Sequence, residues 1–321
     1  MDAPPRLSRR RLLQLAGALP VGALLAACGG SPPAPLDAIV GEEATSEPTV
    51  TPTPEPPFVV AAGEQERLLM AGTPQETPLY VFGSGYPGPI LAVLGGVHGN
   101  EPGGWLAADE LLDAFRPTAG AFLIVPRANR LATQQFVRTT NDMGDLNRLY
   151  PGDPNGLPMA RMAHEIVQAL REFRATVVID MHESWSFYTD RTDTQTGTAF
   201  LGQTVSSSTQ QGLALGREVV DAVNQRVRAD HETLILRDFP PPNFVFPTAT
   251  PGGPPEPTLT AASSSTGGGR SRSSLGLSTH IPGSIALLVE MGQQQQLARR
   301  IAIHVDVVNE VARRIGITRA S

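Results

Sequence analysis

Reactive side chains follow four short apolar runs of this sequence. The ends of these runs carry His98 and Glu101, then Arg127, then His182 and finally Glu290. Two histidines and a carboxylate are a common ligand set of a catalytic zinc ion, which keeps a further coordination position open. Another carboxylate can act as a general base, and a fixed guanidinium can stabilise developing negative charge. The residue types therefore predict one zinc ion per chain and a hydrolytic reaction at that ion.

The apolar runs themselves predict the strands that position these side chains. They are rich in leucine and β-branched residues, as buried strands of a largely parallel sheet are. The runs lie at 90–94, 121–125, 176–179 and 285–289. Amphipathic segments predict helices near 104–115, 159–173, 209–228 and 294–315. This alternation indicates a single α/β/α sandwich with a mixed, largely parallel sheet. Ligands of such a sheet bind beyond the carboxyl ends of its strands, where the five reactive residues should converge.

Two carboxylates close to His182 need an interpretation of their own. Asp180 precedes His182 by two residues and so shares its side of the strand. It either orients a ligand histidine or caps the end of the strand. Glu183 is an alternative to Glu290 as the general base, but strand alternation points its side chain away from the metal.

The motifs GGVHGNEPGG, PRA, DLNRLYPG, DMHE and VEMG, in this order, resemble the aspartoacylase/succinylglutamate desuccinylase family of the zinc metallocarboxypeptidase superfamily. The resemblance extends over residues 72–316. It implies a zinc carboxypeptidase-like fold. It also implies zinc ligands His98, Glu101 and His182, a general base Glu290 and an oxyanion-stabilising Arg127.

The same resemblance implies that Asn147 and Arg148 of the DLNR motif bind a substrate carboxylate. A guanidinium binds a planar carboxylate through two parallel hydrogen bonds, although an ion pair of Arg148 with Asp145 is the alternative. The expected function is hydrolysis of an amide bond next to a carboxylate, as in an N-acyl amino acid deacylase. A metallocarboxypeptidase of exported or cell-wall peptides, and a non-catalytic ligand-binding lipoprotein, are the alternatives. The presence of both Glu290 and Arg127 argues against mere binding.

The N-terminal residues have the pattern of an export signal. A basic segment, SRRRLL, precedes a short apolar run that ends in LAAC, which resembles a lipobox with Cys28 as the lipidated residue. The paired arginines resemble a twin-arginine signal. We expect residues 1–28 to direct export from a bacterial cytoplasm and Cys28 to anchor the protein on the outer face of the membrane. A plain signal peptide with an incidental cysteine is the alternative.

The amino-acid composition predicts the boundaries of the remaining segments of the chain. A proline- and threonine-rich tether is expected at 29–57, because such a segment cannot bury a core. One hydrolase domain is expected at 58–321, with a low-complexity loop at 240–278. The loop leaves the choice between deacylase and carboxypeptidase open. A net charge of −6 argues against a nucleic-acid partner, and the single cysteine excludes an internal disulfide.

Overall fold

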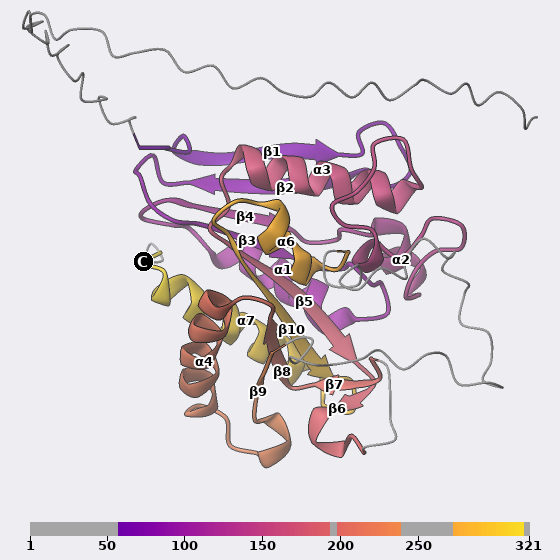
Figure 1. Cartoon of the computed structure of the whole chain (residues 1–321), viewed down its shortest axis with the longest axis vertical. Coiled ribbons are helices and arrows are strands. Elements are labelled where there is room, and N and C mark those ends of the chain that lie inside the picture. Colours follow the sequence, from indigo (N-terminus) through magenta and orange to yellow (C-terminus); the bar gives the residue numbers. More distant parts are fainter. Residues whose placement is uncertain (1–56, 193–197, 239–271, 318–321) are drawn as a thin grey trace, which may run out of the picture. The chain divides into compact units, whose positions relative to one another are not determined.

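A mixed sheet forms the centre of the folded part of the chain. The computed structural model describes residues 57–192, 198–238 and 272–317, and these belong to one unit. The sheet has the strand order β1-β2-β4-β3-β5-β10-β8-β9 (Figure 1). Its strands are β1 Gly63–Leu69, β2 Thr77–Gly83, β3 Ile90–Leu94, β4 Ala121–Val125, β5 Val177–Ser184, β8 Thr204–Ser207, β9 Ile235–Asp238 and β10 Ile285–Gly292. Two short strands, β6 Ser186–Phe187 and β7 Phe200–Gly202, pair with each other.

The four strands predicted from the apolar runs lie together in the middle of the sheet. Strands β4, β3, β5 and β10 run parallel to their neighbours in this group. Strand β2 is antiparallel to β4, and β8 is antiparallel to β10. The mixed, largely parallel sheet is therefore confirmed. Strand β5 is longer than the predicted 176–179, so that His182 and Glu183 lie inside the strand.

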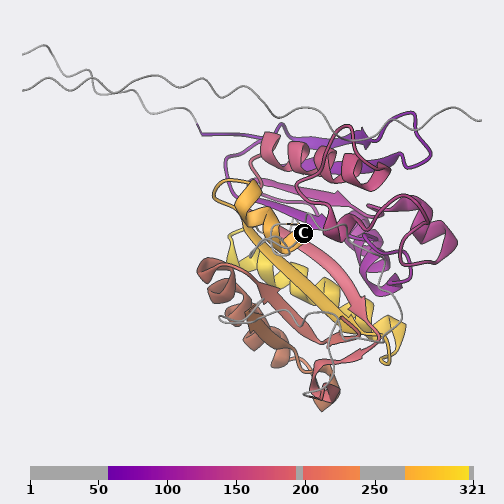
Figure 2. The same ribbon diagram turned by 45° about the vertical axis from the view of Figure 1, so that its right-hand side comes forward.

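Helices cover both faces of this sheet (Figure 1; Figure 2). The helices are α1 Pro102–Ala114, α2 Arg130–Gln135, α3 Pro158–Glu172, α4 Gln210–Asn224, α6 Leu277–His280 and α7 Leu297–Arg314. Buried residues form one cluster with α3 and α6 and a second with α1, α4 and α7. Leu94 of β3 belongs to the first cluster and its neighbour Val93 to the second, because successive side chains of a strand point to opposite faces.

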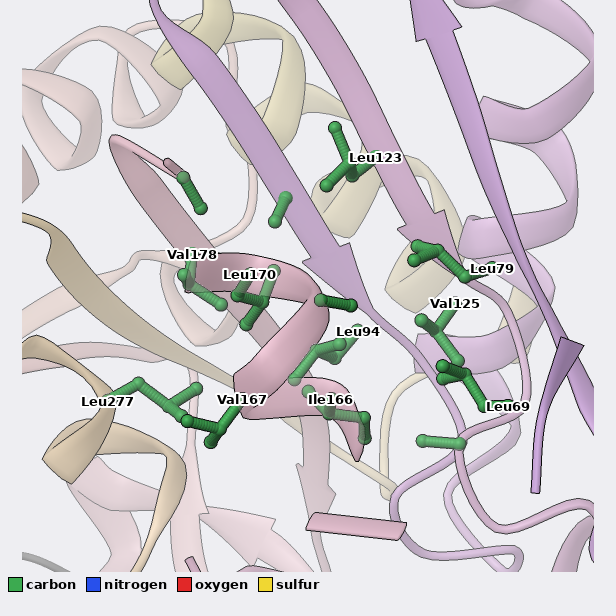
Figure 3. Close-up of a cluster of buried hydrophobic side chains, with 14 of the residues drawn as sticks. Leu69, Leu79, Leu94, Leu123, Val125, Ile166, Val167, Leu170, Val178 and Leu277 are labelled. Atoms are coloured by element: carbon green, nitrogen blue, oxygen red, sulfur yellow. The ribbon is translucent and has the colours of Figure 1, made fainter. Parts of the chain in front are cut away.

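Helix α3 illustrates how the sequence determines this packing. It begins with Pro158, whose fixed φ and missing N–H suit the first helical position. Its side chains Ile166, Val167 and Leu170 recur at helical spacing and pack on the strands together with Leu277 of α6 (Figure 3). The helix thereby buries one apolar stripe and leaves its other side to solvent.

The end of the predicted 240–278 loop requires a correction. Residues Ser274–Gly276 form a 3-10 helix that leads into α6. Leu275 and Leu277 are buried in this segment, and burial of two leucines outweighs the glycine and serine content that suggested a loop. The part of the loop at 239–271 lies outside the described residues. The export signal with Cys28 and the tether that the sequence predicts, up to residue 56, also lie outside the described residues. Among the described helices, none is long and apolar enough to cross a membrane.

Candidate metal centre and active site

Three predicted zinc ligands converge in the structure. His98 lies in the loop after β3, Glu101 directly precedes α1, and His182 belongs to β5. The Nδ1 atom of His98 lies 2.8 Å from Glu101 Oε1, and that of His182 lies 2.8 Å from Glu101 Oε2. The two Nδ1 atoms are 3.1 Å apart. One atom from each residue thus points to a common position, with all three side chains buried.

The loop between β3 and α1 allows this approach because it is built from glycines. Gly96 has a φ of 65°, which glycine adopts without strain. A Cβ atom at Gly99 would lie 1.9 Å from the carbonyl oxygen of Ala132. The chain can therefore pass close to the start of α2 and turn back, so that His98 and Glu101 face the same point.

Each histidine is also held from its far side by a carboxylate. The Nε2 atom of His98 lies 3.0 Å from Asp145 Oδ1, and that of His182 lies 2.7 Å from Asp180 Oδ2. Such a partner fixes the orientation of the ring and leaves the other nitrogen to a metal. The structure thus supports the histidine-orienting interpretation of Asp180. Asp145 was missed as such a partner, although it is the first residue of the DLNR motif.

The electrostatics of this cluster suit a cation. Burial alone would raise the pKa of Glu101, but the adjacent His98 and His182 more than offset it and hold the pKa well below its usual value. Burial alone would lower the pKa of His182, whereas Asp180 and Glu101 raise it well above its usual value. A divalent ion fits this donor set, since its positive charge would balance the buried carboxylates.

Glu290 lies beside the ligands, as the strand pattern predicts. It is the register partner of His182 on the neighbouring parallel strand β10, so that both side chains emerge on the same face. The side chain is buried, and Oε2 accepts a hydrogen bond of 2.9 Å from the hydroxyl of Ser184. Burial raises the pKa of Glu290 above its usual value. A carboxyl group with a raised pKa is suited to taking up and returning a proton near neutral pH.

The alternative base, Glu183, faces the opposite side of the sheet. Its Oε1 accepts from the backbone N–H of Gly103 at 3.0 Å, and its Oε2 accepts from Arg300 of α7 at 2.6 Å. Burial raises its pKa to about 7. Both contacts point away from the histidines, which agrees with the alternation argument and favours Glu290 as the base.

Arg127 lies in a different environment from the one that the sequence predicts. Its guanidinium forms two parallel hydrogen bonds with Asp109 of α1, at 2.5 and 2.6 Å. It also lies 5.0 Å from the ring centre of Trp105. None of the contacts described for its side chain involves His98, Glu101 or His182. A role in stabilising an oxyanion therefore has no support in this arrangement.

Arg138 is the arginine that contacts the ligand cluster. Its Nη1 lies 3.0 Å from Glu101 Oε1 and its Nη2 lies 3.6 Å from Asp145 Oδ2, while 40% of the side chain remains exposed. The loop that carries it folds back on the β3–α1 loop, where the N–H of Gly99 donates to the carbonyl of Arg138. Reasoning from strand ends missed Arg138, because it follows the short helix α2 and not a strand.

Asn147 and Arg148 lie on the 3-10 helix Leu146–Arg148 next to the site. Asn147 is buried, its Oδ1 accepts from the N–H of Ser274 at 2.8 Å, and its Nδ2 lies 3.4 Å from His182 Nε2. Arg148 is half-buried and donates to the carbonyl of Asn147 at 2.7 Å. The ion pairs described for Asp145 are with His98 and Arg138. Binding of a substrate by Asn147 and Arg148 stays a prediction.

The central part of the sequence is similar to a known family of catalytic domains. Residues 87–187 match the succinylglutamate desuccinylase/aspartoacylase catalytic domain. The match contains all three candidate ligands and confirms the family resemblance for this segment. An N-alpha-acetyl-L-2,4-diaminobutyric acid deacetylase of Halomonas elongata is 36% identical over 98 residues, which cover 30% of this chain and 28% of the relative. The family and this relative are amide hydrolases.

Solved structures share the fold. Tripeptide-bound Csd4, a cell shape determinant of Helicobacter pylori, superposes with a TM-score of 0.55 at 18% identity, over 73% of this chain and 53% of Csd4. A succinylglutamate desuccinylase/aspartoacylase of Rhodobacter sphaeroides gives 0.54 at 18% identity, over 81% of this chain and 67% of that protein. At 18% sequence identity, these superpositions show a shared fold only. This chain spans about half of Csd4 and less than a third of the deacetylase.

Proposed function

We propose that this chain is a zinc-dependent hydrolase that cleaves an amide bond next to a substrate carboxylate. The convergence of buried His98, Glu101 and His182 beside buried Glu290 carries this proposal. The match of residues 87–187 to a family of amide hydrolases supports the reaction type. A purely structural metal site would have no need of a further buried carboxylate such as Glu290 on the same face as the ligands.

The chemistry follows from the roles that these side chains can take. Zinc held by His98, Glu101 and His182 would supply Lewis acidity, which would polarise the scissile carbonyl and lower the pKa of water toward neutral pH. Glu290 takes the proton of the attacking water and passes it to the leaving nitrogen. The hydroxyl of Ser184 holds one oxygen of Glu290 and thereby orients the other. Arg138, in contact with Glu101, is placed to stabilise the negative charge that develops on the substrate.

The substrate class is an N-acyl amino acid or a closely related carboxylate. Arg148 lies directly after the buried Asn147, and its half-exposed guanidinium can form a bidentate contact with a carboxylate. The similarity to an acetyl-diaminobutyrate deacetylase, over 98 residues, supports a deacylase. A peptide C-terminus presents the same carboxylate next to an amide, so that short peptides belong in the test.

The test is a product analysis with the zinc-loaded protein. It is incubated with N-acyl amino acids, short peptides and their carboxyl-blocked esters and amides, and products are identified by mass spectrometry. We expect cleavage of free carboxylates and a loss of roughly ten- to a hundredfold in kcat/KM for the blocked analogues, since a charge-assisted hydrogen bond is lost. Equal rates on free and blocked substrates would exclude carboxylate recognition. Absence of cleavage by a zinc-loaded sample would leave only a ligand-binding role.

A further inference from the structure

Glu183 is a buried carboxylate outside the candidate ligand set. It follows His182 directly on β5, and its side chain is completely buried on the opposite face of the sheet. There it contacts the first turn of α1 through Gly103 and the first turn of α7 through Arg300. A buried charge is costly unless it is paired and hydrogen-bonded. Arg300 supplies the charged partner of Glu183, and the N–H of Gly103 supplies a hydrogen bond.

The start of helix α1 explains the contact with Gly103. The first N–H groups of a helix have no partner within the helix and are usually satisfied by the side chain of the N-cap residue. Glu101 is the N-cap of α1, but its side chain makes no such bond, because its oxygens face His98 and His182. Pro102 has no N–H. The N–H of Gly103 is therefore the first that needs an acceptor, and Glu183 provides it.

Glu183 and Glu101 support each other in turn. The backbone N–H of Glu183 donates to Glu101 Oε2 at 2.9 Å, while Glu183 Oε1 accepts from Gly103 two residues after Glu101. The exchange resembles a capping box, in which two residues satisfy each other's backbone groups. Here it links β5 to the start of α1, and Arg300 compensates the buried charge.

Glycine at position 103 is required by the same contact. A Cβ atom there would lie 2.0 Å from Glu183 Oε1, so that any larger residue would displace the carboxylate. The same distance shows that the Glu183 carboxylate lies directly against the backbone of α1.

We propose that Glu183 is a positioning residue for the metal ligand Glu101. It replaces the N-cap that Glu101 cannot provide and fixes the start of α1, so that each oxygen of Glu101 stays directed at one histidine. This inference rests on the proposed metal site. It differs from a purely structural role, in which the pair of Glu183 and Arg300 would only join α1, β5 and α7.

The experiment measures zinc affinity by chelator competition. Glu183→Ala should raise the zinc dissociation constant roughly ten- to a hundredfold, as loss of such supporting contacts does at other metal sites. Glu183→Gln should have a smaller effect, because its amide oxygen can still accept from Gly103. The control is Glu310→Ala, which removes another carboxylate paired with arginines on α7 and should leave zinc affinity unchanged.

Two further readouts separate positioning from stability. Gly103→Ala keeps the carboxylate but pushes it away, and should also weaken zinc binding. Cobalt-loaded Glu183→Ala should have a visible absorption spectrum different from that of the unmodified protein, because the placement of Glu101 changes. If Glu183→Ala does not fold, Gly103→Ala decides the question. Unchanged zinc affinity in folded variants would overturn the inference, whereas an unmodified protein that binds no zinc would overturn the proposed function itself.

Discussion

The two candidate ligand histidines, His98 and His182, each contact carboxylates through both ring nitrogens, which makes them the most direct test of the proposed metal site. We expect the purified protein to contain about one zinc ion per chain. His98→Ala and His182→Ala should each lose that zinc in elemental analysis, because a three-ligand site rarely compensates for a missing ligand. His231→Ala, whose ring lies against Phe187, is the control and should retain zinc. Full zinc content in both ligand variants would disprove the assignment.

Glu290 allows metal binding and catalysis to be separated. Glu290→Gln preserves the shape of the side chain and its contact with Ser184 but removes the base. Zinc content should be unchanged, while kcat should fall by roughly 10²–10⁴-fold, the usual contribution of a general base. Steady-state kinetics with elemental analysis on the same sample checks both. Near-normal turnover would place the base elsewhere.

The two arginines near the site give opposite expectations. Arg138→Ala removes the guanidinium in contact with Glu101 and should lower kcat by roughly 10²–10³-fold, as loss of an oxyanion donor does. Arg127→Ala breaks the pair with Asp109, whose side chains are 34% and 36% exposed. It should cost at most about 1 kcal/mol of unfolding free energy and leave kcat unchanged. The reverse outcome would restore the role that the sequence suggested for Arg127.

Among the secondary-structure elements, the sequence predicted those that carry an apolar pattern. The four central strands were identified because helices cover both faces, so that nearly every residue in them is apolar. The pattern failed in β5, where the run ends at Ile179 but the strand continues through DMHES to Ser184. Polar residues in a buried strand are stabilised by partners that a single sequence does not reveal. Arg138 was missed for the same reason, since its place depends on how α2 packs against the β3–α1 loop.

The metal should also join elements to one another. Its candidate ligands come from the loop after β3, the start of α1 and the interior of β5. Zinc at a thousand times its dissociation constant stabilises a folded protein by about 4 kcal/mol, which corresponds to roughly 10 °C in the melting temperature of a domain of this size. Thermal unfolding with zinc and with a chelator measures this shift. The shift should vanish in His182→Ala, and its persistence there would indicate zinc binding at another place.

For the whole chain, the proposed lipid anchor concerns residues that lie outside the described structure. We propose that Cys28 is lipidated and holds the protein on the outer face of the membrane. Cys28→Ser in the full-length chain should move the protein from the membrane fraction to the soluble fraction, which fractionation and immunoblotting detect. Unchanged membrane association would favour an uncleaved N-terminal anchor.

The pairing of β5 with β10 has a consequence for how this domain tolerates insertions. Glu290 is aligned with His182 across two parallel strands, so the proposed catalysis would require the register of these strands to be kept to within one residue. One residue inserted between Ile285 and Glu290 would turn the carboxylate to the α7 face of the sheet. The resulting protein would still possess every zinc ligand, because these all precede β10. Insertions or deletions of one residue within β10 should therefore yield metal-loaded but inactive proteins. Inactive natural variants are expected among related chains in which the side chains of this strand are shifted by one residue to the opposite face.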